Sequence, residues 1–166
     1  MTDLKKNLVV IYFPTKKDDS SQLFDQLKRN NLKPEVLVEQ VMLMKRNYDE
    51  NKFTVIDFEN ISGEKKEWKD SILGIIIGFL GGPLGSILGW AVGDIVGLEN
   101  AHHVGKETKK MFHYISNFIP RGSEGILAVV HENNLTKLNK MVEFENDGKI
   151  ERFDFDMVKY DLKIKK

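Results

Sequence analysis

Cysteine is absent from this chain of 166 residues. A disulfide framework, thiolate metal sites and a cysteine nucleophile are therefore excluded, and the composition fits a reducing compartment such as the cytoplasm. Net charge of either sign is lacking too, because 25 Lys and Arg residues balance 25 Asp and Glu residues. Without a basic block we expect no nucleic-acid partner.

Catalytic motifs are equally scarce. The glycine-rich stretch 78–86 ends in Gly85-Ser86 followed by Ile87, whereas a Walker phosphate loop ends in Gly-Lys-Ser/Thr. No dinucleotide fingerprint occurs, and sequence spacing picks out no Ser, His and Asp set. We therefore expect a protein without enzymatic activity and without a cofactor.

The apolar pattern predicts an α+β fold. Two unbroken apolar runs, Leu8–Phe13 and Ile126–Val130, are typical of strands that are covered on both faces. The segments Val36–Arg46 and Phe53–Phe58 are predicted to pair as a hairpin, and a last strand is predicted over Ile150–Phe155.

Helical spacing predicts helices between these strands. A first helix is predicted to begin at Ser20 or Ser21, and a second to cover 102–119. A third is predicted around Leu135–Val142, and a short fourth one in the basic tail 157–166. Without the extra hairpin strand and the insertion described next, the order is βαβ followed by βαβ. This is the split βαβ arrangement of ferredoxin-like folds, in which the first and third strands are central. We thus predict one α+β domain over residues 1–166.

The insertion, residues 71–98, has one charged residue, Asp94, and a glycine at nearly every fourth position. Glycines four apart share one face of a helix and let a second backbone approach closely. Gly82-Pro83 interrupts the pattern, so two helical arms are predicted, over 72–81 and 84–97. The predicted self-association surface of this hairpin consists of Gly74, Gly78, Gly82, Gly85, Gly89, Gly93 and Gly97.

Both arms are apolar on almost every side, a property of helices that are buried in protein or in lipid. A single membrane span would split the predicted sheet, and each arm reaches only about 15–21 Å, short of a hydrocarbon core of roughly 30 Å. Two environments remain open. The hairpin lies at a cytoplasmic membrane surface, or it packs against a second copy because one small domain leaves it uncovered. A basic and aromatic flank suits the membrane surface: Lys65, Lys66, Trp68 and Lys69.

Polar residues near the ends of the insertion predict two further sites, an ion pair and a metal or haem site. If the arms run antiparallel, Asp94 comes close to the start of the first arm, where it is predicted to pair with Lys69. Glu99 and His102 have the Glu-x-x-His spacing of carboxylate metal sites, and His103 adds a second imidazole for metal or haem. The alternative is that these three residues form only a polar segment before the helix that follows.

Several of these segments together resemble a bacterial family of unknown function described as predicted membrane proteins. The resemblance rests on the opening strand Leu8–Tyr12, the glycine-rich hairpin Gly74–Gly97, the amphipathic helix after it and the segment Gly122–Val130. It implies a ferredoxin-like domain with an inserted hairpin, no established enzymatic activity, and a link to stress or the cell envelope. It supplies no catalytic residues, and the His102-His103 pair departs from the family pattern.

The sequence therefore predicts a non-enzymatic homo-oligomer, first of all a dimer, that self-associates through residues 72–97 at or near a cytoplasmic membrane surface. The alternative is a soluble oligomeric binding protein whose hairpins enclose an apolar ligand such as lipid or haem.

Overall fold

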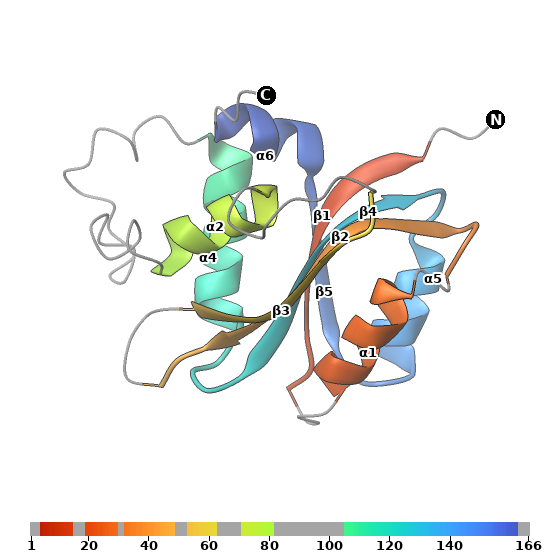
Figure 1. The fold of residues 1–166 in the computed structure, drawn as a ribbon, viewed down its shortest axis with the longest axis horizontal. Helices are drawn as coiled ribbons and strands as arrows, with labels where there is room; N and C mark the ends of the chain where they lie inside the picture. The colour runs from red at the N-terminus through yellow and green to blue at the C-terminus, as the bar shows by residue number, and fades with distance from the viewer. Residues whose placement is uncertain are drawn as a thin grey trace.

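The computed structural model describes residues 4–14, 19–29, 32–48, 53–62, 71–81 and 105–162. These residues form a five-stranded antiparallel sheet with helices on both faces (Figure 1), which confirms the predicted α+β class. The strands are β1 Lys5–Tyr12, β2 Val36–Arg46, β3 Phe53–Asn60, β4 Glu124–Glu132 and β5 Lys149–Asp154. The helices are α1 Asp19–Lys28, α2 Ile72–Gly81, α4 Lys106–Phe118, α5 Thr136–Asn139, the π-helix η4 Lys140–Phe144, and α6 Phe155–Asp161.

The strand order is β3-β2-β4-β1-β5, and every neighbouring pair is antiparallel. The two strands predicted to be central, β1 and β4, each have a neighbour on both sides, as their unbroken apolar sequences require. The predicted hairpin is also confirmed, since β2 pairs with β3 at the edge of the sheet.

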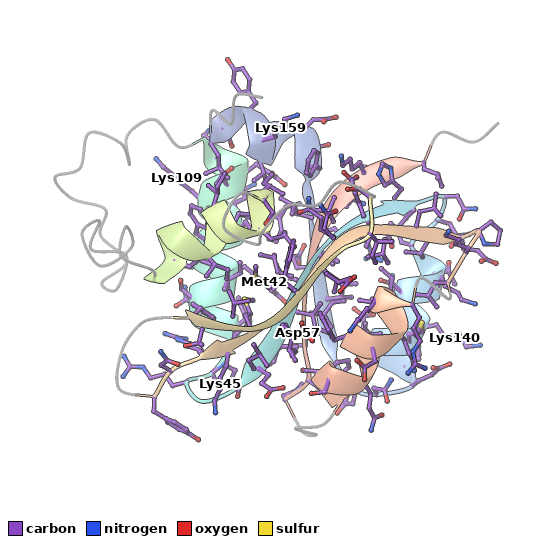
Figure 2. All side chains as sticks on the ribbon, in the orientation of Figure 1. Met42, Lys45, Asp57, Lys109, Lys140 and Lys159 are labelled. Atoms are coloured by element: carbon purple, nitrogen blue, oxygen red, sulfur yellow. The ribbon has the colours of Figure 1, made fainter. Side chains whose placement is uncertain are left out.

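Two apolar layers lie on the two faces of the sheet because successive side chains of a strand point to opposite faces. Leu8 and Val10 contribute to the layer under α2, α4 and α6, which we call the upper core. Val9 and Ile11 contribute to the layer under α1 and α5, which we call the lower core. Figure 2 shows Met42 between the sheet and α2, whereas Lys109 and Lys140 lie on opposite outer sides of the molecule.

Some predicted boundaries are wrong by a few residues. The helix predicted over 102–119 begins at Lys106, because Gly105 has extended backbone; residues 102–104 lie outside the described part of the chain. The last strand ends at Asp154 rather than Phe155. Asp154 accepts a hydrogen bond from the Met157 amide at 3.0 Å and so caps α6, which starts earlier than the predicted tail helix.

The C-terminal end of α4 is held by Arg46 at the end of β2. One guanidinium nitrogen of Arg46 donates to the carbonyls of Ser116 and Ile119, at 2.6 and 2.7 Å. A cation is favourable at a helix C-terminus, where carbonyls lack helical partners. Burial is the main cause that lowers the pKa of Arg46, with the charge of Arg121 as a second cause. Arg46 therefore fixes α4 against the sheet.

A buried ion pair joins β4 and β5 on the side of the lower core. Arg152 donates through two nitrogens to the two oxygens of the Glu132 carboxylate, both at 2.9 Å. Asn7 on β1 donates to the same carboxylate at 3.2 Å, and the remaining donors of Arg152 bind Asn139 and the carbonyl of Leu135. This network ties α5 to three strands.

Candidate functional site

The helix α2 has the bounds that the sequence predicts for the first arm of the glycine-rich hairpin. Ser71 starts it, since its hydroxyl accepts a hydrogen bond from the Gly74 amide at 3.0 Å. Five branched side chains of α2 belong to the upper core: Ile72, Leu73, Ile76, Ile77 and Leu80. These five residues are buried in the same cluster as residues of the sheet, α4 and α6, so this side of α2 is covered within one chain.

The glycines lie on the other side of α2. At about 100° per residue, Gly74 and Gly78 are one turn apart and point away from the five branched side chains. Gly74 is buried, whereas Gly78 and the neighbouring Ile75 are partly exposed, and Ile75 is not part of the upper core. The helix thus has a bulky side that packs within this chain and a flat side that carries the glycines.

The other predicted site residues lie outside the described part of the chain. These are Gly82, Gly85, Gly89, Gly93 and Gly97 of the zipper, Lys69 and Asp94 of the predicted ion pair, and Glu99, His102 and His103 of the metal or haem candidate. These predictions are untested.

Among the residues that are described, no helix is long and apolar enough to cross a membrane.

A second candidate site is a row of polar side chains across one end of the sheet, on the side of the upper core. Glu39 on β2 accepts from Lys6 on β1 and is paired with Nε2 of His131 on β4, each at 2.9 Å. The ammonium of Lys6 also lies 3.9 Å from the centre of the Phe155 ring, where a cation–π contact is favourable. All three polar side chains are about a quarter to a third exposed.

An irregularity of β2 creates this row. The register to β4 shifts between Val38 and Gln40, so Glu39 is the extra residue of a β-bulge. The bulge lets Glu39 and Gln40 lie on the same face, and the buried amide oxygen of Gln40 has no hydrogen-bond partner among the described residues. The sequence analysis missed this site, although two adjacent polar residues within a predicted strand are a signal for a bulge.

The electrostatics of Glu39 reflect competing causes. Partial burial raises its pKa, but the hydrogen bonds from Lys6 and His131, together with their charges, outweigh burial, so the pKa lies below its usual value of 4.5. The described residues bring together no group of three or more His, Asp or Glu side chains suited to a metal ion. The row is thus an ion cluster in which Glu39 pairs with both Lys6 and His131, on the side of the sheet that carries the upper core.

Replacing Glu39 by glutamine is expected to change the pH dependence of stability. Because the folded pKa of Glu39 is lowered, its charge stabilises the fold above pH 4.5, and this contribution is lost as the pH falls through the folded pKa. The wild type should therefore exceed Glu39→Gln by up to about 1 kcal/mol at pH 7, with the difference vanishing in acid. Urea unfolding at several pH values measures it. The exposed Glu145→Gln is the control, and equal pH profiles of wild type and Glu39→Gln would contradict the assignment.

No protein-family model, no curated protein and no solved structure matches this chain.

Proposed function

We propose that this chain is a non-enzymatic protein that self-associates through the glycine side of α2, continued by the glycines that follow it in the sequence. The division of α2 into two sides carries the proposal. Its branched side chains contribute to the upper core of this chain, and Gly74 and Gly78 lie on the opposite side. On that side Ile75 and Gly78 are partly exposed, so they leave apolar surface that the core of this chain does not cover.

A second copy of the chain is the partner we propose for this side. Most oligomers of identical chains are two-fold symmetric, so that the same surface is used by both copies. Glycines one turn apart permit the close approach of two such helices. Ile75, which is partly exposed beside Gly78, would gain burial in the same contact.

We also infer that the sheet is ferredoxin-like. Without β3, the strand order is β5-β1-β4-β2, in which β4 lies between β1 and β2, and β1 lies between β4 and β5. This order is that of two interleaved βαβ units. The helices within these units, α1 and α5, cover the same face of the sheet (Figure 1), which supports the inference. The insertion then emerges on the opposite face, with α2.

Disulfide trapping tests the proposed contact, because the natural chain has no cysteine to interfere. We expect Gly78→Cys to form a covalent dimer rapidly under mild oxidation, since two α2 helices in contact bring their Cα atoms within the roughly 4.4–6.8 Å of a disulfide. Lys109→Cys on the exposed side of α4 is the matched control (Figure 2). Equal rates of dimer formation by the two variants would refute the proposal.

A further inference from the structure

The helix α4 lacks an N-terminal cap of its own. Its cap position is Gly105, which has no side chain and so offers no acceptor to the amide of Thr108, three residues later. The carboxylate of Asp161, 53 residues away at the end of α6, takes this role. One of its oxygens accepts from the Thr108 amide at 3.3 Å and from the Thr108 hydroxyl at 2.9 Å.

The carboxylate of Asp161 occupies the place of the missing cap side chain. A Cβ atom added to Gly105 would lie 2.0 to 2.5 Å from the carboxyl atoms of Asp161. A negative charge at this point is also favourable because it faces the N-terminal end of the α4 dipole. Gly105 and Asp161 therefore fit each other, and a helix that most proteins would cap locally is here capped by a distant segment.

The helix α6 is itself firmly placed. Phe155 and Val158 are buried in the upper core, the core that also contains Leu73 and Ile76 of α2 and Phe112 of α4. Figure 1 shows α6 over the N-terminal end of α4. Through Asp161, α6 holds the start of α4, and α4 in turn packs into the core that supports the bulky side of α2.

We propose that the contact between Asp161 and Thr108 is a latch through which the C-terminal helix α6 controls self-association. This inference rests on the proposed function of α2. The latch keeps α4 in the position that supports α2, and so presents the glycine side of α2 to the second copy. Release of α6 frees the N-terminal turn of α4 and weakens the assembly without any change in the contact surface itself.

Moving the cap of α4 from Asp161 to residue 105 in the full chain tests whether Asp161 controls self-association or only caps the helix. Asp161→Ala removes the distant cap, and the double variant Gly105→Ser with Asp161→Ala supplies a local cap in the space that the carboxylate vacates. Hydrogen exchange of the first turn of α4 reports the cap, and sedimentation over a concentration series reports the dissociation constant of the assembly. Asp156→Ala, an exposed acid on the same helix, is the control.

We expect Asp161→Ala to lose exchange protection at Thr108 and to weaken association about tenfold. The double variant should recover the protection while association stays about tenfold weaker. If the double variant regains full association, Asp161 acts only as a helix cap and the latch is overturned. If the wild-type chain itself is monomeric throughout the series, the proposed function fails, an outcome distinct from failure of the latch alone.

Discussion

Replacing Gly78 by leucine is expected to separate the proposed assembly into folded monomers. The leucine side chain would lie on the flat side of α2, where two helices are proposed to approach closely, and overpacking of such a contact costs about 1–3 kcal/mol. The dissociation constant should rise about 10- to 100-fold. The monomer should stay folded, because leucine favours the helix over glycine by about 0.8 kcal/mol and Gly78 lies away from the upper core.

Sedimentation velocity across a concentration series measures this effect, with circular dichroism to verify the fold. Gly78→Ala is a graded comparison, since a methyl group should weaken association less than leucine. Lys109→Leu adds the same apolar side chain to the exposed side of α4 and should leave association unchanged. If Gly78→Leu associates as tightly as the wild type, the glycine side of α2 is not the contact.

Replacing Arg152 by methionine should cause the largest loss of stability among the substitutions considered. The side chain of Glu132 is fully buried, at 0 % exposure, and Arg152 supplies two of its hydrogen bonds. Methionine has a similar length but leaves the carboxylate with Asn7 as its described donor. An uncompensated buried charge costs about 3–5 kcal/mol, a large part of the stability of a domain of this size.

Urea unfolding at pH 7 gives the free energy of unfolding for this comparison. Lys149→Met removes a positive charge from an exposed position of the same strand and should change the stability by less than about 0.5 kcal/mol. The double variant Arg152→Met with Glu132→Gln should recover part of the loss, because the buried charge is gone. A loss below about 1 kcal/mol in Arg152→Met would show that the pair contributes little.

The strands are predictable from the sequence because burial leaves a direct trace in residue type. Leu8–Phe13 and Ile126–Val130 are apolar without interruption, and both lie inside the sheet. The mixed pattern of Val36–Arg46 equally reflects a strand near the edge. The limits of α2 are predictable too, from glycine spacing and the Gly82-Pro83 interruption.

Long-range polar contacts are what the sequence does not reveal. Nothing near Gly105 in the sequence indicates that Asp161 caps the helix, since the two meet only through tertiary packing. Glycine spacing predicts that Gly74 and Gly78 share one side of α2, but it does not reveal that the other side packs into the core of this same chain. The cluster of Lys6, Glu39 and His131 depends on a bulge that shifts the register of one strand against its neighbour.

Light scattering on the full-length protein, prepared without detergent, tests self-association most directly. We predict a soluble particle of twice the chain mass of 19.1 kDa, or a larger multiple, that dissociates on dilution. A monomer at all concentrations would contradict self-association. Recovery of the protein only with membranes, and its release by detergent as a monomer, would contradict it as well and would assign the glycine side of α2 to lipid.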